Sequence, residues 1–206
     1  MAAPEESGTQ SQPQQRPEPP VRGEGARSHN VWVVGQAGIQ SFILHCNGVQ
    51  WSRVTSPNVV APGGYAIINT LMSIAGAAAN DLWAVGNAGN STLALHWNGS
   101  RWSVVPTPNG PDPWNLLSGV GAVSGTDLWA VGQSYSEIDT CGEGCYENLP
   151  NTLIEHWDGT ASSVLSSPSP VSGDSSLAGV AINGSSIAWA VGTAGGQTLV
   201  EQNGAP

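Results

Sequence analysis

The stretch Leu82–Gly86, with the sequence Leu-Trp-Ala-Val-Gly, decides the fold because near-copies of it recur along the chain. It is followed by Leu93–Gly99, which reads Leu-Ala-Leu-His-Trp-Asn-Gly, and then by Trp102–Val105. Self-similarity at a regular spacing indicates a protein built from repeated structural units. The other copies of the first stretch are Val31–Gly35, Leu128–Gly132 and Ala188–Gly192.

Each unit reads as four short strands separated by turns. A segment of small residues and Val, such as Leu71–Ala77, precedes the Trp-Ala-Val-Gly strand, and Asn98-Gly99 separates the third strand from the fourth. Asn-Gly favours a two-residue type I′ hairpin, whose central positions need positive φ. Four strands in a period of about 46 residues are typical of a β-propeller blade. We therefore expect an all-β propeller of four-stranded antiparallel blades, with the second-strand tryptophans buried between neighbouring sheets.

The four copies are not equally complete. They span residues 30–57, 67–108, 117–168 and 177–204, and the first copy lacks its first strand while the last lacks its fourth. Incomplete blades leave sheet faces and edges open, which proteins avoid. Three arrangements remain: a small ring with an imperfect seam, a fragment of a longer propeller, and a homo-oligomer that completes the ring. We rank the first two above the oligomer.

The order of these segments resembles kelch-type propeller blades. It is most similar to bacterial propeller repeats that carry Trp-Ala-Val-Gly and His-Trp-Asn-Gly, and Gly99–Trp102 also resembles part of a BNR (Asp-box) blade. The chain departs from these patterns, since kelch repeats have a double glycine where this chain has one, and a full Asp-box is missing. The resemblance covers about residues 30–204 and implies a rigid scaffold used for binding, with no activity attached by default.

Composition excludes several classes of partner. The 206 residues contain five arginines, no lysine and 15 acidic residues, for a net charge of -10. Such a chain cannot neutralise a row of phosphates, so we expect no nucleic-acid partner. The sequence contains no run of about 20 apolar residues, so we expect no membrane insertion. Residues 1–28 are rich in Pro, Gln and Glu and read as a disordered tail ahead of a propeller domain at 29–206. An extracellular or cell-surface location is favoured, although a signal peptide is not visible.

The third copy carries an insert within residues 133–151, between its second and third strands. We expect this insert to be a loop on the same side as the long connections between copies, and this side to be the binding surface. The candidate ligand-binding residues are aromatic and acidic side chains of the insert and of these connections: Tyr65, Trp114, Tyr135, Asp139, Glu143 and Tyr146.

Two chemical interpretations of the insert remain open. Cys141 and Cys145 could form a local disulfide, which would leave Cys46 unpaired. The carboxylates could bind calcium, but their spacing matches no EF-hand loop, so we expect no metal and no cofactor. The acidic residues of the insert are Glu137, Asp139, Glu143 and Glu147.

Histidine and aspartate also recur at fixed repeat positions. His45, His96 and His156 occupy one position of the third strand, so a propeller disperses them instead of gathering them on a metal, and we expect a structural hydrogen bond. Asp81 and Asp127 precede the second strand, where we expect their side chains to accept bonds from backbone N–H groups.

We expect a non-catalytic scaffold that binds a glycan or a protein ligand on the face that carries the insert. The sequence contains no nucleophile elbow, phosphate loop or zinc-protease motif. Two alternatives stay open. One is a glycoside-processing enzyme with acidic residues at the channel, such as Asp112 and Asp174. The other is a structural repeat spacer of a surface protein.

Overall fold

The computed structural model describes residues 30–139, 144, 146–171, 173–183 and 188–203, and these residues form only strands, turns and bends. The expected tail at residues 1–28 lies outside the described residues, as do Cys141, Glu143 and Cys145 of the insert. No helix long and apolar enough to cross a membrane occurs in the described part of the chain.

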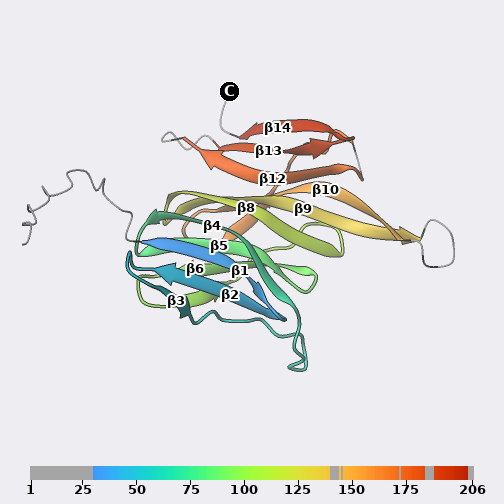
Figure 1. Ribbon diagram of the computed structural model, residues 1–206. Coiled ribbons are helices and arrows are strands. Elements are labelled where there is room, and N and C mark those ends of the chain that lie inside the picture. The colour runs from blue at the N-terminus through green and yellow to red at the C-terminus, as the bar shows by residue number, and fades with distance from the viewer. Residues whose placement is uncertain (1–29, 140–143, 145, 172, 184–187, 204–206) are drawn as a thin grey trace, which may run out of the picture.

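The described strands form four antiparallel sheets that follow one another along the chain (Figure 1). In every sheet each strand pairs with the next strand in sequence. Sheet 1 contains β1 (Val31–Ala37), β2 (Gln40–Cys46) and β3 (Trp51–Val54). Sheet 2 contains β4 (Asn69–Ala78), β5 (Asp81–Ala88), β6 (Ser91–Trp97) and β7 (Trp102–Val105). Sheet 3 contains β8 (Trp114–Ser124), β9 (Asp127–Asp139), β10 (Tyr146–Trp157) and β11 (Ser162–Leu165). Sheet 4 contains β12 (Ser175–Ile182), β13 (Ala188–Ala194) and β14 (Gln197–Asn203). The expectation of an all-β protein is confirmed.

The turns between third and fourth strands differ from the expected two-residue hairpin. Cys46 pairs with Trp51 across a four-residue connection, in which the side chain of Asn47 accepts bonds from two backbone N–H groups. Gly48 takes φ 90°, which an asparagine-glycine pair allows. In sheet 3 the same role falls to Asp158, and bonds from the Thr160 hydroxyl and the following backbone lower the pKa of its carboxyl to about 2. The turn thus needs a short side chain whose oxygen accepts these backbone N–H groups, and this requirement favours Asn or Asp at this position.

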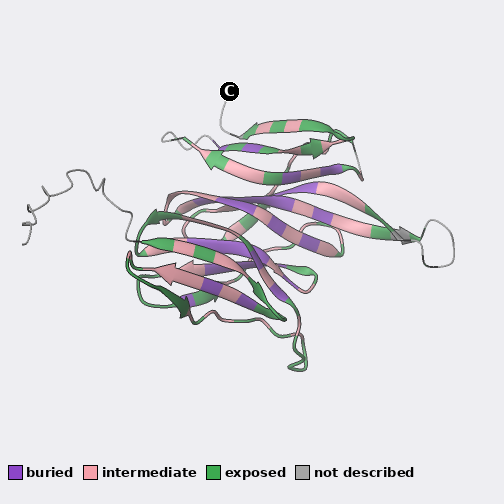
Figure 2. Ribbon diagram, in the orientation of Figure 1, coloured by how far each residue is buried: buried purple, intermediate pink, exposed green. Residues whose placement is uncertain are grey.

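The sheets stack face to face and bury one stripe of apolar side chains at each junction. Strand β1 packs on β4, β4 on β8 and β8 on β12. Between sheets 2 and 3, Trp83 and Val85 pack with Leu117, Leu128 and Ala130. The equivalent clusters join sheet 1 to sheet 2 and sheet 3 to sheet 4. Figure 2 shows that buried residues concentrate on the two middle sheets.

The glycine that ends each Trp-Ala-Val-Gly motif is required by the first strand of its sheet. A Cβ on Gly86 would overlap the carbonyl oxygen of Thr70 in β4, and Gly132 and Gly192 meet equivalent carbonyls. Within the described residues sheet 1 has no such strand, and a Cβ on Gly35 would meet nothing within 4 Å. The glycine is therefore required by a backbone contact that only the sheets with a first strand make, namely sheets 2, 3 and 4.

Sheets 1 and 4 lie at the two ends of the stack, and each has one outward face (Figure 1). Trp189 on β13 is 44% exposed, whereas Trp83 and Trp129 are 3% and 8% exposed. The expectation that every second-strand tryptophan lies between two sheets is therefore wrong for Trp189. The reason is its position: its side chain points away from sheet 3, where the described structure has no further sheet.

Candidate functional site

The insert at residues 133–151 is a hairpin extension, not the expected loop. Strands β9 and β10 stay paired without a break out to Asp139 opposite Tyr146. The matching strands of sheet 2 already turn after Ala88, which pairs with Ser91. An antiparallel partner satisfies the backbone groups of the inserted residues, and this ladder holds them in strands. The hairpin projects beyond the other strands at one side of the stack (Figure 1).

Two of the expected aromatic residues meet at the base of this hairpin. The rings of Trp114 and Tyr135 stack with centroids 5.9 Å apart and an angle of 8° between their planes. They pair directly across β8 and β9, and Tyr135 pairs with Pro150 on β10. Trp114 is the first residue of β8 and does not belong to the connecting loop where we expected it. Both rings are half-exposed.

Acidic side chains occupy the outer part of the same hairpin. Glu137, Asp139 and Glu147 are exposed, and the Asp139 carboxylate accepts a bond from the Gly144 N–H at 3.4 Å. Tyr146 opens β10 opposite Asp139, but its side chain lies outside the described residues. The chain contains no arginine or lysine after Arg101.

The hairpin base is fastened to the connections before β8 and β12. The Asp112 carboxylate accepts bonds from the Ser134 hydroxyl at 2.8 Å and from the Asn151 amide at 3.3 Å. The side-chain oxygen Oδ1 of Asn151 in turn accepts the Gly173 N–H at 3.2 Å. The insert and these two connections therefore share one side of the molecule, as the sequence predicts. The Asp112 carboxylate is already hydrogen-bonded to side chains of the hairpin. We therefore do not develop the glycoside-processing alternative.

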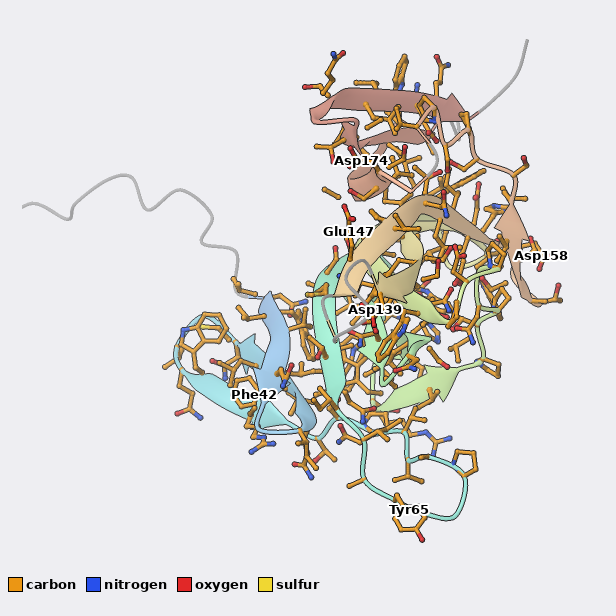
Figure 3. All side chains as sticks on the ribbon, turned by 90° about the vertical axis from the view of Figure 1, so that its right-hand side faces the viewer. Phe42, Tyr65, Asp139, Glu147, Asp158 and Asp174 are labelled. Carbon is orange, nitrogen blue, oxygen red and sulfur yellow. The ribbon has the colours of Figure 1, made fainter. Side chains whose placement is uncertain are left out.

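The remaining candidates lie apart from the aromatic pair. Tyr65 is 75% exposed in the connection between sheets 1 and 2, and Figure 3 shows it away from Asp139 and Glu147. Asp174 is exposed in the connection before β12, and its backbone carbonyl accepts a bond from Gly195. The structure thus brings Trp114 and Tyr135 together with the acidic hairpin, and leaves Tyr65 outside this group.

The repeated histidines and aspartates form the same side-chain pair in sheets 2 and 3. Nε2 of His96 lies 2.8 Å from an Asp81 carboxylate oxygen, and His156 and Asp127 repeat this pair at 2.9 Å. The expectation that these aspartates bond to backbone N–H groups is therefore wrong. Each aspartate carboxylate instead bonds to the histidine of the third strand. The ring of His96 also stacks on Trp83 with centroids 4.5 Å apart. This geometry supports the expected structural role for these histidines.

A buried glutamate and a half-buried one at the same repeat position are features that sequence reasoning missed. Glu155 on β10 is 1% exposed, and burial raises the pKa of its carboxyl to about 7, against a smaller effect of its bond from Ser162. Glu201 occupies the same repeat position in sheet 4, and burial raises its pKa while the Ser167 hydroxyl donates to it at 2.8 Å. The signal was present in the repeat, since copies one and two have Leu44 and Leu95 there.

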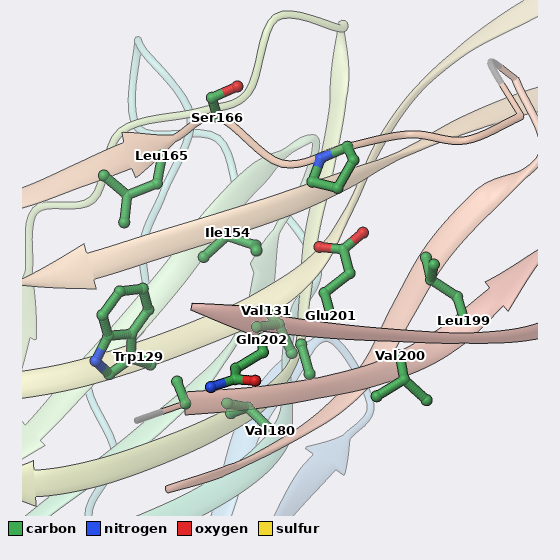
Figure 4. Close-up of a pocket in the computed structure, with 13 residues that line it drawn as sticks. Trp129, Val131, Ile154, Leu165, Ser166, Val180, Leu199, Val200, Glu201 and Gln202 are labelled. Atoms are coloured by element: carbon green, nitrogen blue, oxygen red, sulfur yellow. The ribbon is translucent and has the colours of Figure 1, made fainter. Parts of the chain in front are cut away.

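A cavity of about 250 Å³ lies beside Glu201 between sheets 3 and 4 (Figure 4). The equivalent space between sheets 2 and 3 is about 10 Å³, because Leu128 and Trp157 line and fill it. Sheet 4 has Ala188 at the position of Leu128. The smaller side chain of Ala188 leaves space at this junction of the repeat, and we do not assign the cavity a ligand.

Among the described residues, no three His, Cys, Asp or Glu side chains gather into a metal-binding group. Comparison of the chain with protein-family models, curated proteins and solved structures finds no significant match in any of the three.

Proposed function

We propose that the chain is a non-catalytic binding scaffold of the β-propeller type, and that the hairpin β9–β10 is its recognition element. Four antiparallel sheets in chain order, with β4, β8 and β12 adjacent at the junctions, support the propeller arrangement. The kelch-like order of the repeat segments supports it too. A rigid stack of sheets holds a projecting element in a fixed position, as binding scaffolds do.

The observation that carries this proposal is the extension of one hairpin in one copy of the repeat. Sheet 2 closes the same connection with Gly89-Asn90, whereas sheet 3 continues to Asp139 and Tyr146. Repeat proteins place binding residues where one copy departs from the others. The bonds of Asp112 and Asn151 hold the base of this hairpin, so its aromatic pair is presented in one orientation.

The side chains of the hairpin favour a protein ligand that carries arginine or lysine. Exposed Glu137, Asp139 and Glu147 attract a basic segment and steer its approach. The half-exposed rings of Trp114 and Tyr135 offer faces on which a guanidinium group can lie. A neutral glycan can stack on the ring faces and donate hydroxyl hydrogen bonds to the carboxylates, but it lacks the charge attraction of a basic segment, so we rank it second.

The test replaces residues 135–150 by Gly-Asn, the turn of sheet 2, which keeps Ser134, Asn151 and their bonds to Asp112. The probe is an immobilised arginine-rich peptide, with a lysine-free, glutamate-rich peptide as reference. We expect the parent chain to bind the arginine-rich peptide with an affinity that falls as salt rises, and the replacement to abolish binding. Far-UV circular dichroism checks that the replacement variant still folds.

A second variant tests whether the negative charge of the hairpin contributes to peptide binding while the hairpin itself is kept. The double change Glu137→Gln and Glu147→Gln should weaken binding about tenfold, while Asp174→Asn, an exposed carboxylate of the adjacent connection, should leave it unchanged. Unchanged binding after replacement of the hairpin would contradict the proposed site. Binding to a glycan array but not to the peptide would favour the glycan ligand.

A further inference from the structure

We propose that two copies of this chain associate head to tail, with the outward face of sheet 4 of one copy covering the outward face of sheet 1 of the other. These faces correspond to the two halves of the junction that the molecule builds three times, between sheets 1 and 2, 2 and 3, and 3 and 4. The inference concerns assembly and does not depend on the ligand of the hairpin.

The outward face of sheet 4 is one half of that junction. Trp189 and Val191 of β13 and Val200 of β14 are all about half exposed. At the equivalent positions of sheet 2, Trp83, Val85 and Ala94 are buried against sheet 3. An exposed apolar group of this kind, on side chains that a neighbouring sheet covers elsewhere in the repeat, marks an interaction surface.

The outward face of sheet 1 is the other half. Trp51 of β3 is 52% exposed, whereas its equivalent Trp102 is 5% exposed because sheet 1 covers it. Val31 and Val33 on β1 are exposed as well. The residues of this face and their equivalents correspond one to one: Val31, Val33, Phe42, Leu44 and Trp51 match Leu82, Ala84, Leu93, Leu95 and Trp102.

The internal junctions show how the two faces fit. Trp32 meets Trp102 edge-on with ring centroids 5.8 Å apart, so Trp189 of one copy is expected to meet Trp51 of the other in the same way. Arg53 lies over the Phe42 ring of the sheet 1 face, with its guanidinium carbon 5.1 Å from the ring centroid. A second copy is the occupant we favour, because each chain carries both complementary faces.

The direction of association follows from the same equivalence. Every internal junction joins the tryptophan-bearing face of one sheet to the opposite face of the next, so like faces do not meet. Two chains related by a two-fold axis can make this contact twice and cover all four outward faces. Figure 2 shows that exposed and intermediate residues predominate over buried ones in the strands of sheets 1 and 4.

The test is the oligomeric state of the full chain by sedimentation equilibrium, from low to high micromolar concentration. We expect a reversible dimer, and we expect Trp189→Asp and Val33→Asp each to give a monomer with an unchanged circular dichroism spectrum. Val164→Asp changes an exposed valine of β11 that lies on neither face and should leave the dimer intact. An equimolar mixture of the two monomeric variants should form a heterodimer, since each keeps the face that the other has lost.

Three results would overturn the proposal. A parent chain that stays monomeric at every concentration would show that a different partner, such as further repeats, covers these faces. Dimerisation of either single variant alone would show that like faces meet. Absence of the heterodimer in the mixture would show that the two faces do not bind each other.

Discussion

Sheets 2 and 3 in the middle of the stack and sheets 1 and 4 at its ends carry the same repeat, yet their side chains have different surroundings. Val85 and Val131 are buried, whereas the equivalent Val191 is half exposed. Likewise, Trp102 in sheet 2 is buried, whereas the equivalent Trp51 in sheet 1 is exposed. The comparison teaches that the motif supplies an apolar face, and that only a neighbouring sheet makes this face part of a core.

The largest difference between middle and end sheets should appear when the tryptophans are removed. Trp83→Ala deletes a buried side chain that packs with Val85 and Leu117, and should lower the free energy of unfolding by about 3–5 kcal/mol. Trp189→Ala should cost less than about 1 kcal/mol at low concentration, because its ring is already half in water. Urea unfolding of both variants measures these losses. Equal losses would show that a sheet face covers Trp189 within the single chain.

Glu155 makes the middle junction sensitive to pH. Its pKa is about 7 in the folded chain and 4.5 when exposed, so the folded state binds the proton more tightly. The contribution of Glu155 to stability should therefore be fully present below pH 4.5, fall as pH rises toward 7, and be lost above it, by about 3 kcal/mol in total.

The variant Glu155→Leu, which restores the residue type of Leu95, should remove this pH dependence and stabilise the chain most at pH 8. The measurement is the free energy of unfolding from pH 4 to pH 8. Glu201→Leu in the end sheet is the matched comparison and should have a smaller effect, since Glu201 is less buried. A flat pH profile of the parent chain would contradict the assignment to Glu155.

The smallest expected difference concerns the motif glycine. Gly86→Ala forces a Cβ into the Thr70 carbonyl and should destabilise the chain by about 1–3 kcal/mol. Gly35→Ala meets open space in sheet 1 and should change stability by no more than about 0.5 kcal/mol. Thermal unfolding of both variants tests this, and a similar loss at Gly35 would mean that sheet 1 acquires a first strand from elsewhere.

Much of the candidate site could be read from the repeat, but not its geometry. The departure of copy three located the insert with its Tyr135, and the connection before that copy supplied Trp114 as a second aromatic candidate. Their stacking was not predictable, because it depends on the register of β8 against β9. The loop prediction for residues 133–151 failed since polar residues and glycine favour turns locally, while long-range pairing with the facing strand supplies the hydrogen bonds that extend a hairpin.

The partners of Asp81 and Glu155 show a similar limit of sequence reasoning. Asp81 and His96 were both recognised as repeat positions, but their bond joins strands β5 and β6 and needs the sheet to form. Glu155 stands where Leu95 stands in the preceding copy, and a position-by-position comparison of the copies would have found it.

The sequence by itself determined the strand order, the sheet boundaries and the apolar face of each strand, because these depend on local pattern and on a motif repeated four times. The tertiary structure alone decided which faces are covered, where the insert projects and which carboxyl is buried. These properties arise from contacts between sheets, and the same Trp-Ala-Val-Gly strand has such contacts around Trp83 but lacks them on the outward face of Trp189.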